Sequence, residues 1–326
     1  MDLVHEGFLE WQRPVLTEQK AHELLYNNPI NKDVKFFSFA WSTFIDVVEF
    51  GDRNRANQVI ELVNQMLSTY DLSGAFTVCQ HDKFHRIIPY VKKLGIETIF
   101  ASHMVSDEGY TTKEFYHHNE TKDQTIEGIK IEPIFLWPVN VGEPNKEKDL
   151  WYSFVGSYNE KIYVSDIRQK IFQDKHPRNA IVVERKGWQF DLEVYHKQVK
   201  KQKASRVQEY INKEKSKFYK DVLTRSRFSL CPSGSGPSSI RFLESLATGA
   251  IPVLLADSMM LPEFKGVSWN DCVIKVPEKD YNNLRKILNA ITPEEENHLR
   301  TKGLEAYKKC SGENFVQNIR EHYEST

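Results

Sequence analysis

The sequence has few cysteines, almost no net charge and no long hydrophobic run. Its four cysteines are far apart and form no CxxC pair, a spacing that argues against a zinc site or a disulfide framework. Lys+Arg 44 against Asp+Glu 45 leaves a net charge of -1, so no strongly basic surface for nucleic acid is implied. No apolar run reaches the ~20 residues that span a bilayer. The start, MDLVHEGFLEWQ, lacks the features of a signal peptide. We therefore expect a soluble, cytoplasmic protein with reduced thiols, no nucleic-acid partner and no transmembrane segment.

Apolar runs of strand length alternate with amphipathic segments along the chain, the pattern of parallel α/β sheets. The predicted strands cover residues 34–40, 74–79, 96–101, 131–136, 152–155, 180–184, 227–231, 251–255 and 273–276. The predicted helices begin near residue 17 and cover residues 53–70, 84–94, 164–172, 240–248, 281–291, 293–309 and 313–323. WSTFIDVVEF, after the first strand, is expected to form a loop.

The polar stretch VGEPNKEKD, around residues 142–148, interrupts this alternation and is typical of a linker. It divides the chain into a first domain (1–147) and a second domain (148–311), and leaves a terminal helix (312–326) free to pack back on the first. The 326 residues are enough for two hydrophobic cores. The predicted fold class is therefore α/β, with two Rossmann-like domains that face a cleft.

Residues 226–255, SRFSLCPSGSGPSSIRFLESLATGAIPVLL, predict one strand–loop–helix–strand unit. The Pro/Ser/Gly loop leads into a helix N-terminus, where unpaired N–H groups and the helix dipole attract a phosphate or diphosphate. Arg241, in the first helical turn, can bind the same anion in bidentate fashion. Glu244, three residues later, can accept hydrogen bonds from ribose hydroxyls. The alternative interpretation is a surface loop that caps a helix, with Arg241 and Glu244 as a solvated pair.

Several specific motifs occur together in the second half. CPSGSGPSSIRFLESLATGAIPVLLADSMMLPEF, followed by VSWND, combines Cys-Pro before a glycine loop, Ser-x-Arg-Phe-x-Glu, Gly-x-Ile-Pro-Val, Leu-Pro and Trp269. Residues 152–172, YSFVGSYNEKIYVSDIRQKIF, combine a strand, a glycine turn and an arginine-bearing helix. These residues resemble the exostosin-like glycosyltransferases, glycosyltransferase family forty-seven. CQHDKFHRIIPYVKKLGIETIFASH resembles bacterial and viral members more loosely.

The resemblance implies a GT-B fold and an inverting transfer of a sugar from a nucleotide sugar, expected to be UDP-linked, to a glycan hydroxyl. It places the nucleotide diphosphate at Ser235, Gly236, Ser238, Ser239 and Arg241. Glu244 would then hold the ribose.

Three further residues are implied on the donor side. Gly156 and Ser157 resemble a second phosphate-facing turn, and Arg185 resembles a basic residue aimed at the diphosphate. The alternative for Arg185 is a surface charge at the end of a strand.

No metal or other cofactor is expected at this site. The chain has no suitably placed DxD motif of the kind that holds Mg²⁺ or Mn²⁺ in the other glycosyltransferase fold. The adjacent His117 and His118 in YHHNE point apart and lack further ligands nearby, which favours a loop over a metal site.

Inversion requires a general base opposite the leaving group, and we expect it at the carboxyl end of a strand in the first domain. Asp82 and His81, after the second strand, rank first; Asp46, after the first strand, and His103, after the third, follow. An N-cap role is the alternative for Asp82, because a helix follows it.

Alternatives also remain for the Lys-rich stretch 195–223 and for the function. Acidic residues mixed among the lysines, and few aromatic residues, favour a solvated helix or lid over a basic nucleic-acid helix.

The alternative functions are a non-catalytic nucleotide- or glycan-binding module and another nucleotide-sugar enzyme on a similar fold. A dehydrogenase-type epimerase is disfavoured, since VKFFSFAWSTF lacks GxGxxG.

Overall fold

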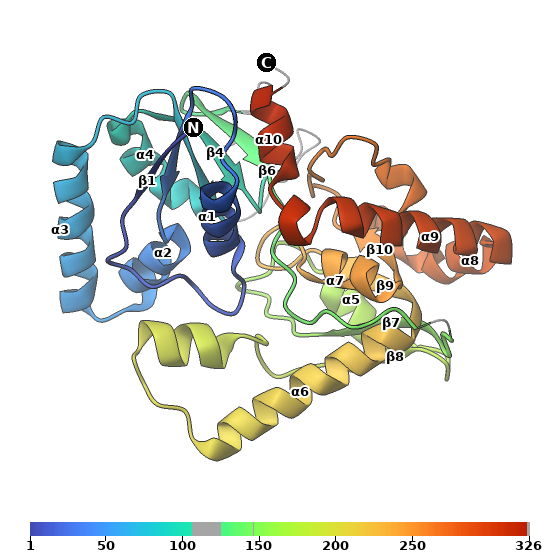
Figure 1. Ribbon diagram of the computed structural model, residues 1–326. Coiled ribbons are helices and arrows are strands. Elements are labelled where there is room, and N and C mark those ends of the chain that lie inside the picture. Colours follow the sequence, from blue (N-terminus) through green and yellow to red (C-terminus); the bar gives the residue numbers. More distant parts are fainter. Residues whose placement is uncertain (106–124, 146, 325–326) are drawn as a thin grey trace.

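The computed structural model describes residues 1–105, 125–145 and 147–324, so that His117 and His118 lie outside the described residues. The chain forms two sheets, one from residues 2–133 and one from residues 150–275, and helices cover both (Figure 1). The fold is therefore α/β. In this described part of the chain, no helix is long and apolar enough to cross a membrane.

The first sheet has the strand order β1-β2-β3-β4-β6-β5, and its neighbouring strands are parallel except for the antiparallel pair β6-β5. The strands are β1 (Asp2–His5), β2 (Lys35–Ser38), β3 (Ala75–Cys79), β4 (Ile96–Ala101), β5 (Thr125–Ile126) and β6 (Ile129–Pro133). The helices are α1 (Thr17–Asn27), α2 (Trp41–Phe50), α3 (Arg53–Thr69), η1 (Phe84–Ile87) and α4 (Ile88–Leu94). Gly95 ends α4 with a φ of 79°, the left-handed conformation that suits glycine.

The second sheet is parallel throughout, with the order β11-β10-β9-β7-β8. The strands are β7 (Leu150–Gly156), β8 (Ile181–Glu184), β9 (Ser226–Pro232), β10 (Ile251–Leu255) and β11 (Ile274–Lys275). The helices are α5 (Ile167–Gln173), η2 (Leu192–Val199), α6 (Arg206–Arg225), α7 (Arg241–Thr248), η3 (Trp269–Asp271), η4 (Glu278–Asn283), α8 (Leu284–Ala290), α9 (Pro293–Lys309), η5 (Gly312–Asn314) and α10 (Gln317–Glu324). β9, the following loop, α7 and β10 together form the predicted strand–loop–helix–strand unit.

The prediction that WSTFIDVVEF forms a loop is wrong, because these residues form helix α2. The residue before the helix, Ala40, provides no side-chain cap. Instead the carboxylate of Glu18, in α1, accepts hydrogen bonds from the Ser42 N–H at 3.1 Å and the Ser42 hydroxyl at 2.6 Å. Burial raises the pKa of Glu18 to about 7, although these hydrogen bonds oppose the rise. The cap comes from a distant part of the chain, so no local motif marks the start of the helix.

The two halves share one hydrophobic cluster. It combines Phe36 and Phe76 of the first sheet with Phe242 of α7. The terminal helix α10 also lies beside the first sheet (Figure 1), where the Asn318 amide donates to the Pro133 carbonyl at 2.8 Å. A large apolar interface of this kind restrains the motion of one half against the other.

The segment around η2 belongs to the second half in sequence but packs against α2 of the first half. Arg55 Nη1 donates to the carbonyl of Gln198 at 2.9 Å. The Gln198 amide in turn donates to the carbonyl of Trp11 at 2.9 Å. The connection between the halves is therefore made at several separate places along the chain.

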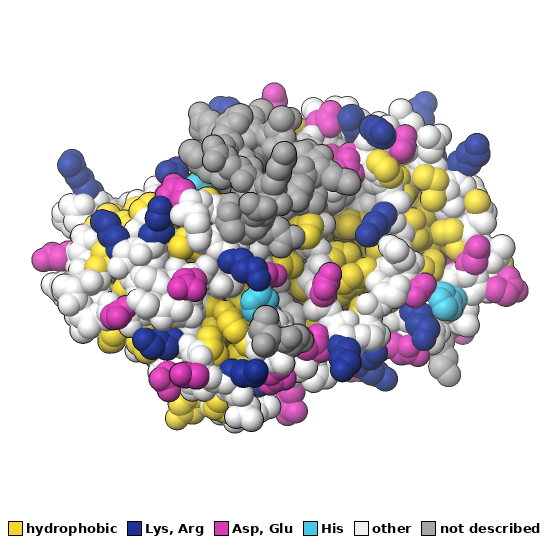
Figure 2. Space-filling model, turned by 90° about the horizontal axis from the view of Figure 1, so that it is seen from above, with side chains coloured by type: hydrophobic (Ala, Val, Ile, Leu, Met, Phe, Trp, Pro, Cys, Tyr) yellow, Lys and Arg dark blue, Asp and Glu magenta, His cyan; other side chains and the backbone are white. Residues whose placement is uncertain are grey.

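The surface carries charges of both signs. On the face shown in Figure 2, Lys and Arg side chains alternate with Asp and Glu over the described residues, without a large field of either sign. This mixture agrees with the net charge of -1 and gives no sign of a nucleic-acid surface on that face.

Candidate functional site

The carboxyl ends of the two sheets bring the predicted loop and the predicted base residues together. Asp82 follows β3, and Ser235 lies in the loop after β9. The Ser235 hydroxyl lies beside the Asp82 carboxylate and helps to lower its pKa. The ring of His103, after β4, lies against Gly236, with Nδ1 only 2.2 Å from the point where a Cβ would stand. Residues far apart in sequence thus form one site between the halves.

Asp46, His81 and Asp82 form a row of polar groups that ends at this loop. His81 Nε2 lies 3.2 Å from Asp46 Oδ1, and Nδ1 lies 2.9 Å from Asp82 Oδ1. The amide of Gln12 donates to the other oxygen of Asp46. The exposed fraction of the side chain rises from 2% at Asp46 through 7% at His81 to 18% at Asp82. Asp82 is therefore the accessible member, and the other two support it from behind.

The two carboxylates control the charge of His81. Burial alone would lower its pKa, but Asp46 and Asp82 raise it to about 10. The Lys83 N–H also donates to Nδ1 at 2.9 Å, and this contact favours a neutral ring. The two carboxylates, one at each ring nitrogen, have the stronger influence on the His81 pKa. Burial alone would raise the pKa of Asp82, but the neighbouring His81 holds it well below its usual range. At neutral pH His81 is charged and Asp82 is ionised.

The helix-cap alternative for Asp82 is wrong. Lys83 occupies the N-cap position of the following helix, η1, and no side chain caps that helix end. The Asp82 carboxylate is used instead by His81 and Ser235. Its position therefore suits chemistry at the loop better than local helix stability.

His103 is buried beside the loop with one ring nitrogen unused. Nδ1 has no hydrogen-bond partner among the residues that the structure describes. Burial lowers the pKa of His103 to about 4, in spite of the nearby Asp82, so the ring is neutral. A neutral imidazole with a free nitrogen can form a hydrogen bond with a ligand at Gly236.

Three arginines gather on the other side of the loop. Arg241 is buried, its Nη2 donates to the carbonyl of Val155 at 2.5 Å, and its Nε has no partner within the described chain. Burial lowers the pKa of Arg185, and the positive charge of Arg241 lowers it further. Burial in the main, with a smaller part from Arg241, lowers the pKa of Arg168 to about 10. This concentration of positive charge, with an unused buried donor, favours an anionic ligand.

Arg168 is the residue that the sequence analysis missed. Its Nε donates to the carbonyl of Ser233 at 2.6 Å and its Nη1 to the carbonyl of Ser157 at 3.1 Å. Its guanidinium also lies 4.6 Å from the centre of the Tyr163 ring. Arg168 therefore joins the loop after β9 to the turn after β7. The motif in residues 152–172 contains this arginine on a predicted helix, but the sequence alone does not show which groups its side chain contacts.

The remaining donor-side residues surround this cluster. Gly156 ends β7, where a Cβ would come within 2.9 Å of a neighbouring ring. Ser238 and Ser239 are buried at the end of the loop, just before Ile240, the N-cap residue of α7. Arg185 reaches from the end of β8 to α6, where it donates to the carbonyl of Lys215 at 2.6 Å. It is half-buried and held in place, unlike a solvated charge at a strand end.

Glu244 already has a full set of partners. It is completely buried, and its Oε1 accepts hydrogen bonds from the N–H groups of Val139 at 3.1 Å and Asn140 at 2.7 Å. Its Oε2 accepts from the Tyr219 hydroxyl at 2.7 Å. Burial raises the pKa of Glu244, although these hydrogen bonds oppose the rise. The interpretation as a solvated pair with Arg241 is wrong. The contact with a ribose stays a prediction, and it requires Glu244 to exchange partners.

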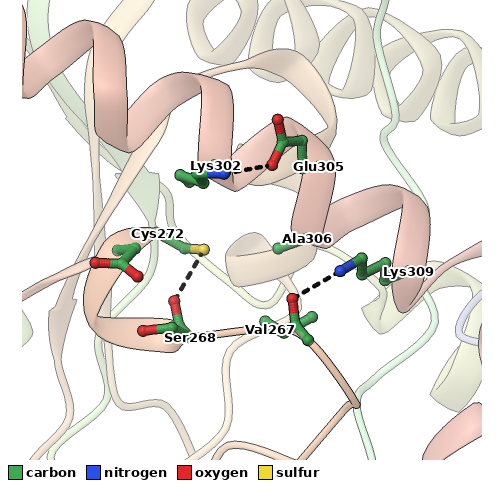
Figure 3. A pocket seen from close by; sticks show the side chains of 9 residues that line it. Val267, Ser268, Cys272, Lys302, Glu305, Ala306 and Lys309 are labelled. Atoms are coloured by element: carbon green, nitrogen blue, oxygen red, sulfur yellow. Dashed lines mark hydrogen bonds and ion pairs between the residues drawn. The ribbon is translucent and has the colours of Figure 1, made fainter.

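A separate pocket in the second half contains none of the predicted site residues. It lies between α9 and the segment 266–272 (Figure 3). Lys302 pairs with Glu305 at 2.9 Å, and Lys309 donates to a backbone carbonyl. Burial raises the pKa of Cys272 to about 11, so its thiol stays protonated. The pocket therefore offers no thiolate, and we assign the functional site to the loop between the halves.

The comparison with known sequences agrees with this site. Residues 100–291, more than half of the chain, match the exostosin GT47 domain. The chain is 38% identical over 174 residues to the probable glucuronoxylan glucuronosyltransferase F8H of Arabidopsis thaliana, covering 52% of this chain and 32% of that protein. It is 26% identical over 296 residues to the probable glucuronoxylan glucuronosyltransferase IRX7 of the same plant, covering 88% and 60%. The chain thus spans only part of the length of these relatives.

The comparison with solved structures supports the fold. HepE of Anabaena, in complex with UDP and glucose, superposes with a TM-score of 0.50 and 10% sequence identity over 100% of both chains. This likeness confirms the predicted GT-B arrangement of two Rossmann-like halves. The matched residues 100–291 include the loop after β9 and the three arginines Arg168, Arg185 and Arg241. With the family resemblance confirmed, the chain belongs to the exostosin GT47 domain family.

Proposed function

We propose that this chain transfers a sugar, with inversion, from a nucleotide sugar to a hydroxyl group of a glycan. The observation that carries the proposal is the meeting of an arginine-lined loop with an ionised carboxylate, through Ser235 and Asp82. The first group suits a departing diphosphate and the second suits an incoming hydroxyl. Family membership supports the same reaction class.

The arginine side of the site stabilises the leaving group. Negative charge grows on the diphosphate as the bond between sugar and phosphate breaks. The Nε of Arg241 is buried and has no hydrogen-bond partner among the described residues, and Arg168 fixes the loop by donating to the Ser233 carbonyl. Preorganised donors of this kind stabilise the transition state without rearrangement during the reaction. We expect no metal requirement, because these cations would supply the needed positive charge.

Asp82 is the proposed general base. The acceptor oxygen forms a bond with the anomeric carbon, and the bond from that carbon to the phosphate oxygen breaks. The acceptor hydroxyl gives its proton to the Asp82 carboxylate, and the nucleoside diphosphate leaves with the bonding electrons. His81, held by Asp46, orients Asp82 through the 2.9 Å contact. Attack from the side opposite the leaving group inverts the sugar.

The donor and acceptor are proposed from the relatives. HepE, which shares the fold, was crystallised with UDP and glucose, and this favours a UDP-sugar donor. The two Arabidopsis relatives are named as probable glucuronosyltransferases of a polysaccharide, and this favours a glycan acceptor. The identity of the sugar depends on side chains around it that these names do not fix.

Turnover of a panel of nucleotide sugars, followed by release of nucleoside diphosphate, tests the proposal. Asp82→Asn keeps the size of the side chain, so we expect donor binding to remain and turnover to fall about 10²–10⁴-fold. Arg241→Ala should instead weaken donor binding about tenfold or more, measured by calorimetry, because it removes a charged donor. Arg225→Ala is the matched control, since Arg225 is an exposed arginine paired with Asp149.

Four outcomes would contradict parts of this assignment. Full turnover by Asp82→Asn would exclude it as the base, and unchanged donor binding by Arg241→Ala would exclude the arginine site. Nucleotide binding without any turnover by the unaltered chain would favour the non-catalytic binding module. Activity that disappears in EDTA and returns with Mg²⁺ would contradict the expected metal independence.

A further inference from the structure

Helix α6 projects from the second half with much of its length unpacked. A capping box of Ser205 and Gln208 fixes its first turn. Its buried side chains, Tyr219, Val222 and Leu223, all lie in the last third of the helix. In Figure 1, α6 passes along the edge of the second half, and its N-terminal end extends away from the sheets.

The unpacked part of α6 carries a stripe of exposed apolar side chains. Val207, Tyr210, Ile211 and Phe218 are 66%, 65%, 46% and 44% exposed. Tyr210, Ile211 and Phe218 follow Val207 by three, four and eleven residues, so all four lie on one side of the helix. This side is about a third of a turn away from the side that carries the buried residues. Isolated exposed apolar residues are common, but four of them on one side of one helix indicate an interaction surface, although the exposed Glu214 interrupts the stripe between Ile211 and Phe218.

Basic side chains border this apolar stripe on the side away from the core. Arg206, Lys213, Lys217 and Lys220 are all exposed and fall on one adjoining strip of the helix. Residues 200–220 contain eight basic and two acidic side chains, whereas the whole chain has a net charge of -1. Positive charge is therefore concentrated where apolar side chains are exposed.

We propose that α6 binds the surface of an anionic lipid bilayer. The apolar stripe would enter the boundary between headgroups and acyl chains, while the lysines contact lipid phosphates. Nucleic acid would match the charge but would leave the exposed Val207, Ile211 and Phe218 in water. A lipid surface satisfies both features at once. This proposal does not depend on the chemistry at Asp82, because α6 carries no proposed base.

Sedimentation of the whole chain with vesicles tests this proposal. One set contains phosphatidylcholine alone, and the other contains about one third phosphatidylglycerol. We expect the chain to bind the anionic vesicles about tenfold or more tightly than the neutral ones. The triple variant Val207→Ser, Ile211→Ser and Phe218→Ser, which keeps every charge, should lose most of this binding.

Matched variants separate the two contributions. Lys213→Glu, Lys217→Glu and Lys220→Glu together should abolish the preference for anionic vesicles. Two control variants change exposed residues elsewhere: Leu62→Ser with Ile162→Ser, and Lys92→Glu with Lys93→Glu. Both controls should bind like the unaltered chain. Circular dichroism confirms that each variant is folded.

A second measurement reports insertion. Tyr210→Trp should give an added tryptophan emission that shifts to shorter wavelength when anionic vesicles are present. Failure of the unaltered chain to bind these vesicles would overturn the proposal. So would binding that survives loss of the apolar stripe, binding without an emission shift, or equal loss in the control variants.

Discussion

Gly236→Ala tests whether the two sides of the site meet as closely as the structure shows. The added Cβ would lie 2.2 Å from Nδ1 of His103. Ordinary contacts of this kind need roughly 3.4 Å, so the ring or the loop must move by about 1.2 Å. His103 is buried, and overpacking at such a position typically costs about 1–3 kcal/mol. We expect the free energy of unfolding to fall by this amount, measured by urea titration.

His103→Ala provides the decisive comparison for Gly236→Ala. This second change removes the ring that the new methyl group would meet. The double variant should therefore be more stable than the sum of the two single effects, with a coupling energy of about 1–2 kcal/mol. Gly187→Ala is the control, because no atom lies within 4 Å of its added Cβ. A Gly236→Ala variant with unchanged stability, or single effects that add within about 0.5 kcal/mol, would refute the contact.

Two further predictions concern buried ionisable side chains, Glu244 and His81. Glu244→Ala leaves the N–H groups of Val139 and Asn140 without their acceptor. We therefore expect the free energy of unfolding in urea to fall by about 2–4 kcal/mol, and by less for Glu244→Gln. Equal stability of the two variants would contradict this prediction. The raised pKa of His81, about 10 in the folded chain, stabilises the fold fully below about pH 6.5, and this contribution is lost as pH rises through 10. The stability difference between the unaltered chain and His81→Gln should shrink from pH 7 to pH 10. A difference that stays constant over this range would show that the ring is neutral.

The regular strands were predictable from sequence because their side chains are apolar on both faces. Residues 34–40, 74–79 and 96–101 predict β2, β3 and β4 within two or three residues. The ends of α4 and α7 were also predictable, since Gly95 and Gly249 both adopt the left-handed conformation there. Local conformation and burial are sufficient for these elements.

Elements that depend on distant partners were not predictable in the same way. Helix α2 is capped by Glu18, and its buried, aromatic sequence shows no helical stripe. Strand β1 (Asp2–His5) has no apolar run of its own, and it is completed by pairing with β2. The importance of Arg168 depends on two carbonyl groups supplied by separate loops. Sequence spacing gives no information about contacts of this kind.

The base candidates could be collected from sequence but not ordered. Strand ends gave Asp46, His81, Asp82 and His103 as a group, because parallel strands bring such positions to one edge. Only the structure shows that Asp82 adjoins Ser235 while Asp46 lies deepest. The same holds for Glu244, whose spacing from Arg241 fits a ribose contact but whose carboxylate holds the segment at Val139.

The shared core of Phe36, Phe76 and Phe242 has a consequence for how the chain comes apart. A protease cut in the polar stretch 142–148 would remove the covalent link there, yet α10 and the contact from Gln198 to Trp11 would remain. The two fragments should stay associated through gel filtration. Heating should likewise melt both halves in one cooperative transition, because neither half keeps its apolar surface covered without the other.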